Sequence, residues 1–141
     1  MKYEYFDKKD ADIESKLVRH YGDDIFRQIS LKYYIHLQTH DYDFGFMSAE
    51  GEPSFILCKL HRDFEEMNIC LVCSRPNSKD GEELLGMASQ KATEMNVKYL
   101  SLLFIGDAKF VAWYTTLGFV VVSAKEYPNG ELKAYSMKKR L

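Results

Sequence analysis

The sequence predicts an α/β (α+β) fold: a mixed, mostly antiparallel sheet with a central parallel strand pair and flanking helices. The parallel pair follows from two short apolar runs, residues 67–73 and 99–104, which are typical of buried strands. Between them, apolar residues recur at the spacing of one helix face: Leu84, Leu85, Ala88, Ala92 and Met95. We expect this helix to begin at Gly81 and to end at Asn96. A strand, a helix and a strand of this length form a crossover, which makes both strands parallel.

Before this crossover unit, the sequence predicts one strand and two helices. Residues 2–6 alternate weakly between apolar and polar, as in a short strand. Asp10 can cap a first helix that ends at Gly22, and a second helix follows to residue 34. Apolar residues also alternate over residues 31–37, so a strand is the alternative structure for the end of the second helix.

A hairpin comes next. Two apolar-rich runs, residues 42–49 and 54–60, form its strands, and residues 50–53 include the Gly and Pro that favour a turn. The polar residues 62–66 then connect the hairpin to the crossover unit.

After the crossover unit, the sequence predicts a short helix and a closing hairpin. Apolar residues from Phe110 to Leu117 recur at helical spacing between Asp107, a good N-cap, and Gly118, a good helix stop. The hairpin has strands at residues 119–124 and 132–137 and a turn at residues 127–130. No repeat or linker interrupts the chain, so we expect a single domain over residues 1–141.

Composition limits the classes of partner. The formal net charge is -2, with 19 basic and 21 acidic residues, so we expect no nucleic acid partner. The apolar runs are far shorter than the ~20 residues of a membrane span, and we expect no membrane partner. Three cysteines without a signal peptide indicate reduced thiols and a cytoplasmic protein. Cys70 and Cys73 should face opposite sides of a strand, so we expect no metal site there.

The turn after the first crossover strand, residues 74–81, is the first candidate for a ligand site. It should lie at the carboxyl end of a strand, where the N-terminus of the following helix points. Backbone N–H groups and the helix dipole attract phosphate at such a position. Arg75 and Lys79 can add positive charge to the turn.

The segment from Asp107 to Phe119 is the most specific part of the chain. Trp113, Tyr114, Gly118 and Phe119 fit the pattern N-x-x-A-x-x-F/L-Y-x-x-x-G-F at its spacing. This segment resembles the GNAT superfamily of acyl-CoA-dependent N-acetyltransferases. The order of the predicted elements resembles the same family over nearly the whole chain. Asp107 stands where that family has Asn, and Phe110 where it has Ala. A capped amphipathic helix followed by a strand also explains the apolar positions.

The phosphate turn resembles the same family less closely. The family pattern is R-G-x-G-x-G-x-x-L-L, of which this chain keeps Gly81, Leu84 and Leu85. Pro76, Asn77 and Lys79 stand where Arg and Gly are expected, and Gly allows backbone conformations that Lys adopts less readily.

The resemblance implies that a primary amine attacks the thioester carbonyl of acetyl-CoA. Tyr114 would then protonate the departing thiolate, and a backbone N–H within residues 67–73 would hold the oxyanion. Glu65 or Glu66 would act as the base through water, with His61 as the alternative and a solvated charged turn as the structural explanation. The acetyl-CoA contacts implied are Leu71, Val72, Cys73, Asn77, Ser78, Lys79, Asp80, Gly81, Glu82, Asp107 and Tyr114.

Acidic residues gather in the segments that would flank the acceptor: Asp23, Asp24, Asp41, Asp43, Glu65 and Glu66. Negative potential attracts cations, so a polyamine or another small cationic amine, or a lysine side chain, is favoured as acceptor. The alternative is a non-catalytic acyl-CoA-binding or protein-interaction module, because a fold does not fix a function. The oligomeric state stays open, a homodimer included.

Overall fold

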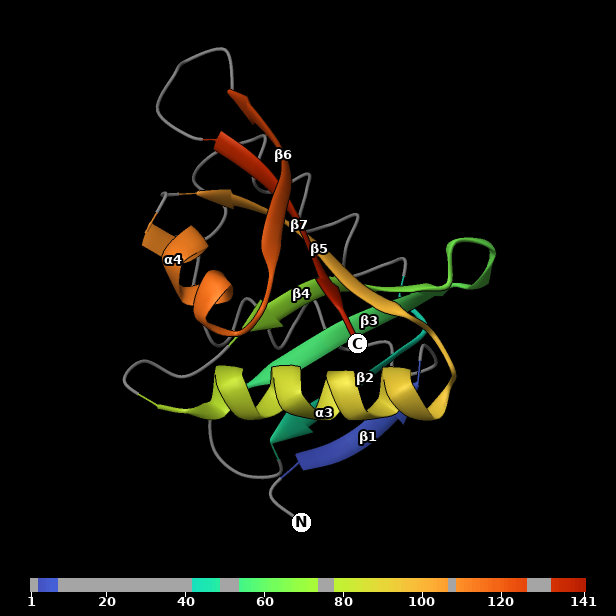
Figure 1. Ribbon diagram of the computed structural model, residues 1–141. Helices are drawn as coiled ribbons and strands as arrows, with labels where there is room; N and C mark the ends of the chain where they lie inside the picture. The colour runs from blue at the N-terminus through green and yellow to red at the C-terminus, as the bar shows by residue number, and fades with distance from the viewer. Residues whose placement is uncertain (1–2, 8–41, 49–53, 74–77, 107–108, 127–132) are drawn as a thin grey trace. The chain divides into compact units, whose positions relative to one another are not determined.

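The computed structural model describes residues 3–7, 42–48, 54–73, 78–106, 109–126 and 133–141. Seven strands in this part of the chain form one sheet with the order β1-β2-β3-β4-β5-β7-β6 (Figure 1). The two helices predicted between Asp10 and residue 34, and the predicted turns at 50–53 and 127–130, lie outside the described residues.

The elements follow one another in the order that the sequence predicts. They are β1 (Tyr3–Asp7), β2 (Phe44–Ser48), β3 (Phe55–His61), the 3-10 helix η2 (Arg62–Phe64), β4 (Glu66–Cys73), α3 (Asp80–Glu94), β5 (Tyr99–Gly106), α4 (Lys109–Thr116), β6 (Val120–Glu126) and β7 (Lys133–Arg140). The predicted fold class is therefore confirmed. Among the described residues, no helix is long and apolar enough to cross a membrane.

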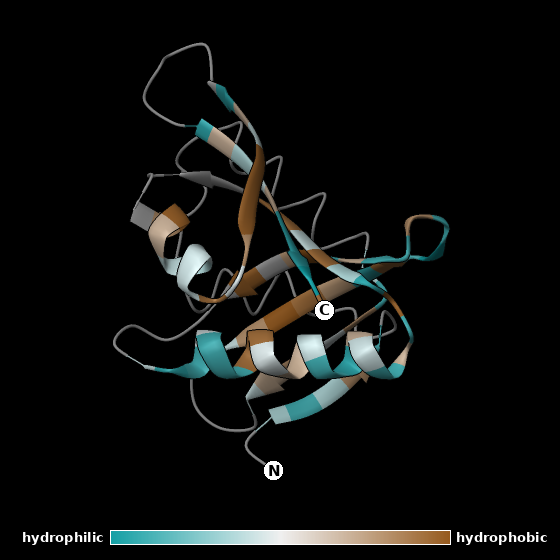
Figure 2. Ribbon diagram, viewed as in Figure 1, coloured by the Kyte–Doolittle hydropathy of each residue, from teal (hydrophilic) through white to brown (hydrophobic). Residues whose placement is uncertain are grey.

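The described chain divides into two compact units, and the first comprises Met1–Lys59 and Cys70–Ala88. Within it, β1 pairs antiparallel with β2, and β2 pairs antiparallel with β3, which confirms the predicted first strand and hairpin. Four consecutive residues of β3, from Phe55 to Cys58, have no exposed surface. Because consecutive strand residues point to opposite faces, both faces of β3 are covered. Figure 2 shows this strand largely in the hydrophobic colour.

Gly45 is the tightest point of this antiparallel sheet. It lies opposite Phe6 in the β1–β2 ladder and opposite Leu57 in the β2–β3 ladder. A Cβ at Gly45 would overlap the Ile56 carbonyl oxygen and the Phe6 ring. The missing side chain therefore lets the Phe6 ring cross the backbone of β2.

The second unit comprises Leu60–Ile69 and Ser89–Leu141. Here β4 and β5 are parallel, as predicted, over a ladder from Glu66↔Tyr99 to Ile69↔Leu102. On its other side, β5 pairs antiparallel with β7 along its whole length, and β6 pairs with β7 to complete the closing hairpin. The predicted single domain over residues 1–141 stays a prediction.

The ladders of the second unit separate two faces. One face is apolar and almost fully buried, with Met67, Ile69, Leu100, Leu102 and Met137 each exposed by 4% or less. The other face carries the side chains that alternate with these, and most of them are polar. Burial of the apolar set fixes the register, since a shift by one residue would exchange the two faces.

Helix α3 ends where the sequence predicts. Asn96 adopts a left-handed conformation with φ 62°. The Val97 N–H donates to the Ala92 carbonyl at 3.1 Å and the Asn96 N–H to the Thr93 carbonyl at 3.1 Å, which is a Schellman motif. At its other end, α3 begins at Asp80, one residue before the predicted Gly81.

Replacement of Gly45 tests the tight crossing in the first unit. We expect Gly45→Ala to lower the free energy of unfolding by about 1–3 kcal/mol, because strand backbone and an aromatic ring must shift to admit the methyl group. Gly86→Ala is the matched control, since a Cβ there meets nothing within 4 Å. In the middle of α3 it should stabilise the protein by about 0.5–1 kcal/mol. Chemical denaturation measures both; equal stabilities for the two variants would contradict the crossing.

Candidate functional site

Helix α4 ends in a second Schellman motif. Gly118 has φ 98°, the Phe119 N–H donates to the Tyr114 carbonyl at 3.1 Å, and the Gly118 N–H donates to the Thr115 carbonyl at 3.0 Å. The motif brings the third residue from the end of the helix against the second residue beyond it. The Schellman motif at the end of α4 therefore explains the spacing Tyr-x-x-x-Gly-Phe.

The ring of Tyr114 is held firmly by this arrangement. Its centroid lies 5.8 Å from that of Phe119 and 4.8 Å from that of Trp113, and the residue is 8% exposed. Edge-to-face pairs of this kind add to the stability that burial gives. These ring contacts set the position of the Tyr114 hydroxyl. Asp107, the predicted cap of this helix, lies outside the described residues.

The two glutamates proposed as bases occupy different positions. Glu65 is exposed, left-handed with φ 52°, and 3.1 Å from the Lys98 ammonium. Glu66 was predicted in the connection before the strand, but it is the first residue of β4. Its backbone joins the ladder opposite Tyr99, so the strand begins one residue earlier than its apolar run.

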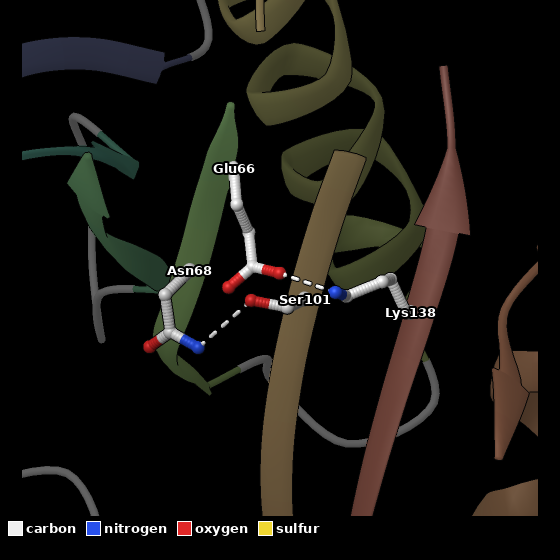
Figure 3. A network of polar contacts seen from close by, with 4 residues as sticks. All are labelled: Glu66, Asn68, Ser101 and Lys138. Carbon is white, nitrogen blue, oxygen red and sulfur yellow. Dashed lines mark hydrogen bonds and ion pairs between the residues drawn. The ribbon is translucent and has the colours of Figure 1, made fainter. Parts of the chain in front are cut away.

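Glu66 belongs to a polar network that spans three strands (Figure 3). Its Oε1 lies 2.9 Å from the Lys138 Nζ on β7. On the same face, the Asn68 Nδ2 donates to the Ser101 Oγ at 3.1 Å. The Lys138 ammonium also lies 5.3 Å from the centre of the Tyr99 ring, within the range of a cation–π contact. The hydrogen bond to Glu66, together with the charge of Glu66, raises the pKa of Lys138.

Lys138 is absent from the predicted site because the predicted last strand ends at residue 137. In the structure, β7 continues to Arg140. A signal was present: polar residues alternate with apolar ones in the first crossover strand, and again in the last strand as Ser136, Lys138 and Arg140. The alternation is hard to recognise there because Lys138, Lys139 and Arg140 are three consecutive charged residues.

Around the first turn of α3, the structure describes only some of the predicted acetyl-CoA contacts. Ser78, Lys79 and Glu82 are exposed, and Gly81 is buried. Val72 is half-buried, while Asn77 and the side chains of Leu71 and Cys73 lie outside the described residues. These positions belong to the first compact unit, and Glu65, Glu66 and Tyr114 belong to the second.

Asp80 has a structural partner for each of its carboxylate oxygens. The Tyr3 hydroxyl donates to Oδ1 at 2.9 Å, and the Ser54 hydroxyl donates to Oδ2 at 2.7 Å. The residue has no exposed surface. The carboxylate therefore ties the start of α3 to β1 and to the residue before β3, which gives Asp80 a structural role.

Three acidic residues, Asp80, Glu82 and Glu83, lie in the first turn of α3. Carboxylates at a helix N-terminus interact favourably with the helix dipole, and so they stabilise α3. The same charges oppose a bound phosphate. Lys79, exposed immediately before the helix, is the described cation nearest in sequence that could offset them.

The described residues include no group of three or more His, Cys, Asp or Glu side chains placed to hold a metal ion. Cys58 and Cys70 are buried and are not joined in a disulfide. Burial, and the neighbouring Cys70 to a smaller extent, raise the pKa of the Cys58 thiol well above its usual range. Cys58 therefore stays protonated, whereas metal ligation and nucleophilic attack need the thiolate.

By sequence, no protein-family model and no curated protein matches this chain. By structure, it matches the ribosomal-protein-S18-alanine N-acetyltransferase from Escherichia coli with a TM-score of 0.71 and 17% identity, covering 98% of this chain and 93% of that one. The chain has the GNAT fold. The IAA acetyltransferase from Bacillus cereus gives a TM-score of 0.69 and 14% identity, covering 99% of this chain and 98% of that one.

One similar structure of the GNAT fold contains the expected co-substrate. It is assigned as a streptothricin acetyltransferase from Bacillus anthracis and is in complex with acetyl coenzyme A. Its TM-score is 0.60 at 16% identity, and the match covers 72% of this chain and 64% of that one. These likenesses establish the fold predicted from the sequence.

The buried carboxylate of Asp80 gives a test of how the start of α3 is held. We expect Asp80→Ala to lower the free energy of unfolding by at least about 2 kcal/mol, because two buried hydrogen bonds to a carboxylate lose their acceptor. Glu82→Ala in the same turn is the exposed control and should change it by about 0.5 kcal/mol or less. Urea denaturation at neutral pH compares the two. An equally small effect of Asp80→Ala would show that the contacts do not stabilise the fold.

Proposed function

We propose that this protein is an N-acetyltransferase that transfers an acetyl group from acetyl-CoA to a primary amine. The observation that supports this most is the GNAT fold over nearly the whole chain, shared with structures named as acetyltransferases. The chain adds its own chemistry to the fold, with a buried tyrosine near the end of α4 and a carboxylate at the start of β4.

In the proposed reaction, the amine nitrogen bonds to the thioester carbonyl carbon and the carbon–sulfur bond breaks. Glu66 takes the proton that the amine gives up, through a water molecule, and Tyr114 gives a proton to the departing thiolate. Tyr114 then regains a proton from solvent, and Glu66 releases its proton to solvent. A backbone N–H near the end of β4 would hold the oxyanion, as in other acyl transfers. Glu65 is the weaker candidate for the base, because its side chain is 54% exposed and that of Glu66 is 16% exposed.

Acetyl-CoA would lie against the end of β4 and the first turn of α3, with its pyrophosphate facing backbone N–H groups. The acidic first turn should weaken this binding. The same feature favours the second candidate function, a protein-interaction module on the GNAT fold that does not turn over acetyl-CoA.

For the acceptor we propose a cationic primary amine, such as a polyamine or a lysine side chain. The negative potential behind this proposal is smaller than the sequence suggests, because Lys98 and Lys138 neutralise Glu65 and Glu66. Asp43 is half-buried beside β2, and the other acidic residues that would flank the acceptor lie outside the described residues.

An amine panel tests the proposed function. Acetyl-CoA should raise the melting temperature, and free CoA thiol should appear over time with at least one primary amine. Desulfo-CoA controls for binding without chemistry. Binding without thiol release from any amine would reject the enzyme and leave an acyl-CoA-binding module. No thermal shift and no thiol release would favour the interaction module.

Tyr114→Phe separates a catalytic from a structural tyrosine. The ring still packs in Phe, so we expect the melting temperature to change little, while kcat falls by about 10²-fold or more because the proton donor is lost. Tyr135→Phe is a matched control, since Tyr135 on β7 is also 8% exposed. Steady-state kinetics on the amine that the wild-type protein turns over best distinguishes the two roles of Tyr114. Similar kcat values for both variants would remove Tyr114 from the mechanism.

A further inference from the structure

We propose that Lys138 is a positioning residue, which holds the Glu66 carboxylate in the orientation that accepts the proton of the amine. The inference rests on the proposed function, because it assigns Glu66 the role of base. All the contacts involved lie within the second compact unit.

Strand register places Lys138 within reach of Glu66. Glu66 is opposite Tyr99, and Tyr99 is opposite Arg140; one step along, Asn68, Ser101 and Lys138 form the next row. All these side chains lie on one face of the sheet, because directly paired residues share a face. Lys138 therefore crosses β5 diagonally to reach the first residue of β4, and Figure 3 shows its ammonium meeting the carboxylate.

Two contacts fix the lysine, so it can in turn fix the glutamate. Its Nζ is 2.9 Å from Glu66 Oε1 and 5.3 Å from the centre of the Tyr99 ring. In the part of the chain that the structure describes, Glu66 makes its ion pair through Oε1. The Oε2 atom keeps its lone pairs for a proton. A carboxylate held by one oxygen has a defined direction for the other.

The neighbouring glutamate provides an internal comparison. Glu65 and Lys98 also form an ion pair, at 3.1 Å, but their side chains are 54% and 58% exposed. Glu66 is 16% exposed and Lys138 41% exposed. Exposed pairs compete with water and hold their partners loosely, whereas partial burial makes a pair more persistent. Of these two pairs, the Glu66 pair is therefore better suited to hold a carboxylate for catalysis.

Lys138 itself is a poor acceptor of the acetyl group. The hydrogen bond and the charge of Glu66 raise the pKa of Lys138, so its amine stays protonated at neutral pH. A protonated amine has no lone pair for attack on a thioester. The lysine therefore acts on Glu66 and does not compete with the substrate amine.

The test is a double-mutant cycle on the amine that the wild-type protein turns over best. Lys138→Met keeps the length of the side chain and removes the charge. We expect kcat to fall about tenfold to hundredfold, as for other small losses of catalytic alignment, with an unchanged KM for acetyl-CoA. Lys138→Arg should restore most of kcat. In a Glu66→Gln background, Lys138→Met should have no further effect, because the residue acts through Glu66.

Lys98→Met is the matched control and should leave kcat within about twofold of the wild type, since Glu65 is not the proposed base. Melting temperatures of all variants show whether a change in kcat reflects loss of fold. Additive losses in the double mutant, or an unchanged kcat in Lys138→Met, would overturn the inference. A loss in Lys98→Met alone would transfer the role to the Glu65 pair. No turnover by the wild-type protein rejects the proposed function itself, whereas turnover with additive losses rejects only the role of Lys138.

Discussion

The parallel ladder between β4 and β5 is the constraint on which the second compact unit depends. It runs over four residue pairs, and burial of Met67, Ile69, Leu100 and Leu102 fixes its register. The side chains between these residues must then point to the opposite face. That single register places Glu66 beside Tyr99 and Asn68 beside Ser101, and β7 adds Lys138 to the same face. Packing of the apolar face therefore creates the polar network.

In the first compact unit, the main constraint is the stabilisation of the N-terminus of α3. Three carboxylates in its first turn favour the helix, and the buried one also ties the helix to Tyr3 and Ser54. Acidic residues that stabilise a helix N-terminus also oppose an anion at that place. The charges that stabilise α3 would therefore weaken the binding of a diphosphate at this helix end.

The pattern Tyr-x-x-x-Gly-Phe shows how a structural and a functional signal can coincide. A Schellman motif needs a left-handed residue after the helix, and a contact between residues on either side of it commonly accompanies the motif. Tyr114, Gly118 and Phe119 meet these demands. The pattern predicted the fold correctly because it encodes a helix end. The pattern does not show whether the Tyr114 hydroxyl donates a proton, because that depends on which ligand binds beside it.

Local patterns in the sequence determined the order of the described elements, the parallel pair, and the helix ends at Asn96 and Gly118, since apolar periodicity and glycine-like conformations act over a few residues. The resemblance to the GNAT superfamily pointed to Tyr114 and to Glu65 or Glu66. Only the tertiary structure decided that Glu66 opens β4, that Asp80 is buried, and that Lys138 reaches Glu66. Each of these depends on pairing between residues 26 to 77 positions apart, as from Ser54 to Asp80 and from Tyr3 to Asp80. Lys138 lies in a strand that pairs with β5, and no local pattern in the sequence identifies β5 as its partner.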